Sequence, residues 1–250
     1  MDIIQAIILG IVQGITEWLP ISSSGHLVIF QKLMDLHLPV YYDIILHLGS
    51  LLVVLLAFKN KILKLIKGVI NKDRQSIYFV YKLLVASIPI AVVGLALNNT
   101  VKSAFESSKA VGVGLLFTAL LLFSTYFPGK IKKFSAVKAS IIGIAQAIAI
   151  FPGVSRSGAT IGAGLLLGVK RDEAAFFSFM LFIPAIIGAT LLELPGMTAV
   201  ENWPAVIIGF IATIISGYIS LILLIKLIKQ QKFWQFGFYC LAIGTILLFN

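Results

Sequence analysis

Long apolar runs, broken by short polar stretches, set the pattern of this chain. A helix that spans a bilayer needs about 20 consecutive apolar residues, and runs of roughly 10–14 are more typical of re-entrant segments. The pattern predicts an all-α integral membrane protein. Its six predicted transmembrane helices lie at roughly 41–58, 78–97, 109–127, 173–192, 204–225 and 234–249.

Two further apolar regions are interrupted by polar turns. Residues 2–18 and 26–34 are separated by Pro20 and three serines, and residues 136–151 and 159–168 are separated by the turn "PGVSRS". Each half is too short to cross the bilayer by itself. We therefore expect two re-entrant helical hairpins that enter the membrane and turn back.

The two hairpins are related by an internal repeat. Shifted by 133 residues, "GIVQGITEWLPISSSG" (10–25) lies over "GIAQAIAIFPGVSRSG" (143–158), and three predicted spans follow each copy. Because three is odd, the second copy must enter from the opposite face, as in inverted-topology repeats that build a site near the midplane. The prediction is a single membrane domain over 1–250, with inverted repeats at about 1–130 and 131–250.

Composition and charge support this class and orient it. Hydrophobic residues make up 59% of the chain and charged residues 12%, against about 25% charged in soluble domains. Lysine-rich gaps at 59–74, 129–138 and 226–232 are expected in the cytoplasm, and the acidic gap 193–203 outside, which places both termini outside. The net charge of +10 thus predicts contact with membrane lipids and no nucleic-acid partner. The single Cys240 excludes a disulfide framework.

The two turns carry the candidate anion site. Irregular backbone at membrane depth survives only where protein or a water-filled cavity surrounds it. In each turn, hydroxyls and a glycine immediately precede an apolar helix, whose N–H groups can bind an anion. The alternative, left open, is that these serines only cap the helices. The candidate binding residues are Gln13, Ser22, Ser24, Gly25, Ser155, Ser157, Gly158 and Thr160.

Ionisable and nucleophilic side chains near the two turns are candidates for catalysis. A carboxylate in a membrane segment is costly, so Glu17 is a functional candidate unless it reaches the surface. Together with Glu17, Ser23 and His26 are the residue types of a nucleophile, a base and an orienting acid. In the second repeat Arg156 replaces Ser23, and arginine binds phosphate bidentately.

The motif "YDIILHLGS" (42–50) opens the first full span. Asp43 and His47 are four residues apart, so they share a helix face. They could hold a metal, a water or the serine turn, or only brace the hairpin through hydrogen bonds. The sequence leaves both alternatives open for this supporting pair.

Together these motifs resemble the undecaprenyl-diphosphate phosphatase family, which is also known for bacitracin resistance. "QGITEWLPISSSGHL" fits its (E/Q)xxxE-LPxSSxGH signature, and "YDIILHLGS" and "FPGVSRSGATI" match its other two motifs. The likeness extends over the whole chain in length, span number and motif order. The first position of the family's carboxylate pair is here the amide Gln13, a permitted variant that weakens the expectation that both residues bind metal.

The resemblance implies an enzyme of the bacterial plasma membrane that hydrolyses undecaprenyl diphosphate, a C55 polyprenyl lipid. The products are undecaprenyl phosphate and inorganic phosphate, which recycles the lipid carrier for cell-wall synthesis and confers bacitracin resistance. The active site would face the outer side. The family's catalytic positions fall on Glu17, Ser23, His26 and Arg156.

Three points stay open on this basis. The resemblance implies a divalent cation, Mg²⁺ or Ca²⁺, with Glu17 as the candidate ligand. Whether Ser23, His26 or a water attacks phosphorus is not decided, nor is a homo-oligomeric state. The alternative function is a polyprenyl-phosphate flippase, because an inverted repeat with broken helices is also a carrier architecture.

Overall fold

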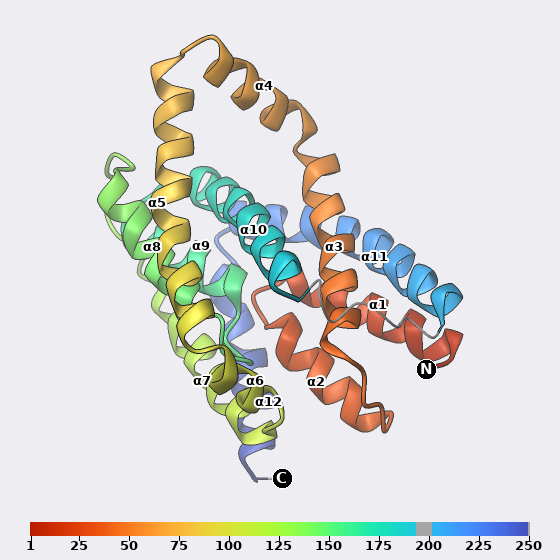
Figure 1. Cartoon of the computed structure of the whole chain (residues 1–250). Helices are drawn as coiled ribbons and strands as arrows, with labels where there is room; N and C mark the ends of the chain where they lie inside the picture. The colour runs from red at the N-terminus through yellow and green to blue at the C-terminus, as the bar shows by residue number, and fades with distance from the viewer. Residues whose placement is uncertain (194–201, 250) are drawn as a thin grey trace.

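The computed structural model describes residues 1–193 and 202–249, and this part of the chain contains helices and turns but no strand (Figure 1). The predicted all-α class is therefore confirmed. The helices are α1 (Ile3–Trp18), α2 (Ser23–Leu33), α3 (Val40–Ala57), α4 (Lys59–Ile70), α5 (Arg74–Ala96), α6 (Asn98–Phe105), α7 (Ser108–Ser124), α8 (Ala136–Ile148), α9 (Arg156–Leu166), α10 (Arg171–Glu193), α11 (Trp203–Lys229), the 3₁₀ turn η2 (Phe233–Gln235) and α12 (Phe236–Phe249).

The predicted spans are helical, but their number is not established. Within the described residues, α5, α10 and α11 are long and apolar enough to cross a membrane. The total rises to five if the bent pairs α3–α4 and α6–α7 each count as one span. The helix at the C-terminal end is shorter, which leaves the predicted count of six unconfirmed.

Both predicted hairpins form as helix–turn–helix units. α1 and α2 are joined by a turn that includes Pro20, and α8 and α9 by a turn that includes Pro152. Each second helix begins at a serine N-cap whose hydroxyl accepts an N–H bond from a glycine three residues on. The hydrophobic breaks thus mark real turns in the backbone.

Small residues fix the first hairpin in place. α1 packs along α11, and a Cβ atom added to Gly10 would collide with the carbonyl oxygen of Gly209. One turn on, a Cβ at Gly14 would collide with Ser216. Such small-residue interfaces let membrane helices approach closely. The Ser220 hydroxyl also donates to the Ile15 carbonyl at 2.8 Å, which ties the end of α1 to α11.

The second hairpin makes the matching contact with the other half of the chain. α8 packs along α5, where a Cβ at Gly143 would collide with the Ala86 carbonyl. α7 and α12 pack through Gly112 and Gly244, and a Cβ built on either one would lie 3.0 Å from the carbonyl oxygen of the other. Reciprocal contacts of this kind are what a two-fold relation produces. The inverted repeat remains a prediction, and these contacts agree with it.

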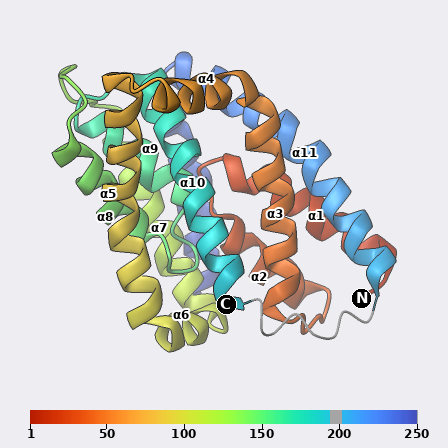
Figure 2. The same cartoon turned by 45° about the horizontal axis from the view of Figure 1, so that its top comes forward.

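The basic gap at 59–74 differs from the expected connection, because it contains the helix α4. This helix has no buried residue, is amphipathic, and joins α3 to α5 across one end of the molecule (Figure 2). Its lysines alternate with Ile and Leu positions, a pattern typical of helices that lie in the membrane interface. Averaged hydropathy hides such a helix because the lysines cancel its apolar face.

The lysine-rich gaps lie at one end of the helices. The Ala136 N–H donates to the Tyr78 hydroxyl at 3.0 Å, which joins the 129–138 gap to the start of α5. The ring centroids of Tyr126 and Trp234, beside two of the gaps, are 5.1 Å apart. This common end is what the charge pattern predicted. Of the acidic gap 193–203, Glu201 lies outside the described residues.

Candidate active site

The two hairpin turns meet each other inside the bundle. The Ser157 hydroxyl donates to the Leu19 carbonyl at 3.4 Å, and a Cβ at Gly158 would lie 3.4 Å from the ring of Pro20. A Cβ at Gly25 would lie 3.3 Å from Gly153 of the other turn. The N-termini of α2 and α9 therefore lie close together, although the two helices come from opposite halves of the chain.

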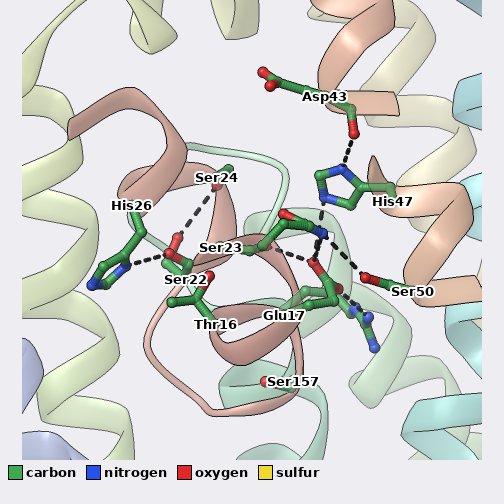
Figure 3. Close-up of polar contacts among 12 residues, drawn as sticks. Thr16, Glu17, Ser22, Ser23, Ser24, His26, Asp43, His47, Ser50 and Ser157 are labelled. Atoms are coloured by element: carbon green, nitrogen blue, oxygen red, sulfur yellow. Dashed lines mark hydrogen bonds and ion pairs between the residues drawn. The ribbon is translucent and has the colours of Figure 1, made fainter. Parts of the chain in front are cut away.

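The Glu17 carboxylate is the centre of this place (Figure 3). Its Oε1 accepts a bond from Arg156 Nη2 at 2.6 Å. Its Oε2 accepts bonds from the Ser23 hydroxyl at 2.6 Å and from Gln13 Nε2 at 3.1 Å, and lies 3.3 Å from His47 Nε2. The Glu17 side chain is 5% exposed, so the alternative of a glutamate that reaches the surface is wrong.

The Arg156 guanidinium packs against two aromatic rings. Its guanidinium carbon lies 4.1 Å from the centroid of the Phe182 ring and 5.9 Å from that of Trp18. Such cation–π contacts gain strength where water is excluded. Thr160 donates its hydroxyl to the Arg156 carbonyl at 2.8 Å and lies 2.6 Å from the Ser178 hydroxyl. The predicted role of Thr160 in substrate binding stays a prediction; in this structure its buried hydroxyl ties α9 to Ser178 of α10.

His47 presents a charged imidazole to Glu17. Its Nδ1 lies 2.7 Å from the Asp43 carbonyl oxygen, which can only accept, so Nδ1 carries a proton. Its Nε2 faces the Glu17 carboxylate, which also only accepts. Both nitrogens must therefore be protonated for these contacts to be favourable, and His47 is an imidazolium. The Asp43 side chain instead accepts from Gln31 Nε2 at 2.8 Å, so this residue braces α2 against α3.

His26 points away from the predicted nucleophile, which corrects the expected layout. Its Nδ1 lies 2.8 Å from the Ser22 carbonyl oxygen and its Nε2 lies 2.7 Å from the Tyr239 hydroxyl. Figure 3 shows the ring on the opposite side of the turn from Glu17. The ring is held there by its two partners, the Ser22 carbonyl and the Tyr239 hydroxyl of α12.

The remaining predicted hydroxyls pair within their own turns, and Ser157 also reaches the Leu19 carbonyl of the other turn. The hydroxyls of Ser22 and Ser24 are 3.3 Å apart, and those of Ser155 and Ser157 are 3.2 Å apart. Ser22 and Ser155 each cap the helix that follows. Ser22 also has φ 69°, a backbone conformation that non-glycine residues rarely adopt and that costs about 1–3 kcal/mol.

Three contributors were not singled out from the sequence. Ser50 accepts from Gln13 Nε2 at 3.4 Å, Ser178 lies beside Thr160, and Tyr239 lies beside His26. Ser50 had a signal, because it ends the 42–50 motif and follows His47 by one helical turn. Ser178 and Tyr239 lie in apolar helices with no local pattern that distinguishes them.

The resting site does not fit a cation held by the protein alone. Among residues 1–193 and 202–249, no group of three or more His, Cys, Asp and Glu side chains could hold a metal ion. Both oxygens of Glu17 already face positive or donating groups, namely Arg156, His47, Ser23 and Gln13. A cation would have to bring further oxygen ligands with it.

Comparison with known proteins identifies the family. The family model described as bacitracin resistance protein BacA matches residues 6–246. The chain is 43% identical to a protein named undecaprenyl-diphosphatase from Korarchaeum cryptofilum, and the match covers 99% of each chain. It is 39% identical to one of the same name from Methanosphaera stadtmanae, over 98% of this chain and 97% of the relative. A third, from Halothermothrix orenii, is 37% identical over 99% and 98%. This chain is a member of the bacitracin resistance protein BacA family.

Proposed function

We propose that this protein hydrolyses undecaprenyl diphosphate to undecaprenyl phosphate and inorganic phosphate. The observation that carries the proposal is the joined site: a serine hydroxyl 2.6 Å from a buried carboxylate, which itself binds a partly buried arginine at 2.6 Å. Its relatives bear the name undecaprenyl-diphosphatase. Recycling of a cell-wall lipid carrier, and resistance to bacitracin, follow from this activity.

Substrate binding starts from the Glu17–Arg156 ion pair. A diphosphate offers the guanidinium more negative charge than one carboxylate does, so the phosphate takes the place of Glu17 on Arg156. The first N–H groups of α2 and α9 add an anion site at the same point. The aromatic rings of Trp18 and Phe182 keep Arg156 in place while its partner changes.

The same exchange prepares the nucleophile. Glu17, released from Arg156, keeps its bond from the Ser23 hydroxyl and takes that proton as Ser23 attacks the terminal phosphorus. The bond from this phosphorus to the bridging oxygen breaks, and undecaprenyl phosphate leaves. Water then attacks the phosphoserine, releases inorganic phosphate and restores Ser23. Arg156 and the His47 imidazolium balance the charge that develops on the phosphoryl oxygens.

A divalent cation, Mg²⁺ or Ca²⁺, is proposed to arrive with the substrate. Mg²⁺ is commonly held by one or two carboxylates together with substrate phosphates. Here the diphosphate oxygens would supply most ligands, and Glu17 is the carboxylate at hand. The ion would neutralise phosphate charge when it is bound.

We further propose that the site opens to the outer face of the plasma membrane and that both termini lie outside. The support is the common end of the lysine-rich gaps, which the positive-inside rule assigns to the cytoplasm. α4, with its exposed lysines, would lie on the inner surface. The substrate enters laterally from the outer leaflet, with its tail between the helices.

The test is phosphate release by the purified protein in detergent, with farnesyl diphosphate or undecaprenyl diphosphate as substrate. Detergent abolishes the second compartment, so release of phosphate requires hydrolysis and not transport. We expect phosphate release, and a lower rate with a chelator. No phosphate release, combined with lipid movement across vesicles that contain the protein, would favour the flippase instead.

A further inference from the structure

A hydrogen-bond chain runs from α12 to the turn that carries the nucleophile. The Tyr239 hydroxyl lies 2.7 Å from His26 Nε2, and His26 Nδ1 lies 2.8 Å from the Ser22 carbonyl oxygen. A carbonyl oxygen only accepts, so Nδ1 carries the proton, and in a neutral ring Nε2 then accepts from the tyrosine. Tyr239 therefore selects the tautomer in which His26 donates to Ser22.

The hydrogen-bond chain ends at Ser22, whose backbone conformation is unusual. Ser22 has φ 69° and ψ 98°, outside the helical and extended regions, and it immediately precedes Ser23. A residue in such a conformation persists only where its surroundings hold it there. The second turn places its positive φ on Gly153 instead, where the conformation costs little.

The two hydrogen bonds of His26 lie beside a largely apolar groove. His26 and Tyr239 line a groove of about 540 Å³ between α1, α2 and the start of α12. Its walls are largely apolar, with Ile11, Ile15 and Phe30 among them. The rings of His26 and Tyr239 also stack, with centroids 5.6 Å apart and planes 15° from parallel. In apolar surroundings a hydrogen bond is electrostatically stronger than in water.

We infer that Tyr239 is a positioning residue for the reaction, which acts through His26 on Ser22 and so directs the Ser23 hydroxyl at Glu17. His26 has the same kind of role here and is not the base. The inference rests on the proposed function in one respect, that Ser23 performs the attack. It adds a residue from the last helix to a site otherwise built by α1, α2, α3, α9 and α10.

The first test is Tyr239→Phe, which removes the hydroxyl and keeps the stacked ring. Loss of one hydrogen bond predicts a roughly threefold to tenfold lower kcat with little change in KM, because Tyr239 does not touch the phosphate. Tyr218→Phe, an exposed tyrosine of α11, is the matched control and should match the wild type. Combined with His26→Ala, Tyr239→Phe should add no further loss.

The second test measures the protonation of the His26 ring and does not depend on enzyme turnover. The chain has three histidines, so ¹⁵N-histidine spectra can be assigned with His37→Gln and His47→Gln. In wild type we expect His26 to carry its proton on Nδ1 with Nε2 as a bonded acceptor. In Tyr239→Phe the Nε2 resonance should move to that of an acceptor without a partner. An unchanged His26 signal, or additive losses in the double variant, would overturn the inference. Failure of the phosphatase activity in wild type would instead count against the proposed function.

Discussion

The two hairpin turns have similar backbone structures but carry side chains of opposite chemistry. Each ends in a serine that caps the next helix. The first turn then places Ser23 at the helix start, with Glu17 before the turn; the second places Arg156 at the equivalent point, with Ile150 before it. One turn therefore supplies hydroxyl and carboxylate, and the other supplies a cation. The comparison teaches that divergence between repeats, more than the repeat itself, makes the site.

The turns also differ in where they carry backbone strain. In the first, the positive φ falls on Ser22, which borders Ser23; in the second it falls on Gly153, while Ser155 has an ordinary φ of −71°. A Cβ at Gly153 would collide with the Val111 carbonyl, so that glycine is required for packing. Strain therefore lies beside the hydroxyl that is proposed to react.

The largest effect is expected from removal of the hydroxyl that only the first turn offers. Ser23→Ala should lower phosphate release by roughly 10⁴-fold or more, as for other nucleophile deletions. Ser124→Ala, on α7 and bonded only within its own helix, is the control and should behave as wild type. A Ser23→Ala protein with near-normal turnover would remove Ser23 from the mechanism.

The cation of the second turn comes next. Arg156→Ala should lower kcat/KM by roughly 10²- to 10³-fold, the usual cost of a lost transition-state donor. It should also destabilise the protein, by about 3–5 kcal/mol, because the buried Glu17 carboxylate loses its charged partner. Arg156→Lys keeps the charge but loses the planar fork and should recover only part of the activity. Arg74→Ala, at an exposed arginine, checks for a general effect of charge.

A smaller effect is expected at His47, which reaches the first turn from α3. His47→Gln removes the imidazolium beside Glu17 and should lower kcat by about 10- to 100-fold, the range for a charged hydrogen bond. His37→Gln, in an exposed loop, is the matched control. Equal rates for the two variants would show that His47 has a structural role and does not contribute to the reaction.

The smallest expected effect is on stability, and it compares the backbone strain of the two turns. Ser22→Gly should raise the free energy of unfolding in detergent by about 1 kcal/mol, because glycine adopts φ 69° without cost and is itself a tolerated N-cap. Ser155→Gly, where φ is −71°, should instead lower it by a few tenths to about 1 kcal/mol. Similar changes in both variants would mean that Ser22 is not strained.

Much of this architecture was predictable from the chain. Apolar runs located the helices, and the aligned motifs indicated that Glu17 and Arg156 belong to one site, because irregular turns at membrane depth need a polar partner. The amphipathic α4 and the number of spans were not predictable from averaged hydropathy, which cannot separate a short span from an interfacial helix.

The roles of the two histidines show where sequence reasoning ends. His26 lies three residues from Ser23 in the chain yet faces α12, whereas His47, 24 residues away, reaches Glu17. His26 is held by Tyr239, which is 213 residues away in the chain and has no local pattern that marks it. Proximity in the chain was therefore a poor guide to proximity in the site.

The most direct test of the central claim is to look for phosphate on the protein. The purified enzyme would be mixed with radiolabelled diphosphate substrate, stopped within the first turnover in acid or in base, and mapped by peptide mass spectrometry. Phosphoserine survives the acid stop, and phosphohistidine the basic one. The account predicts acid-stable phosphate on Ser23 that is absent from Ser23→Ala. Base-stable phosphate on His26, or full turnover by Ser23→Ala, would contradict it.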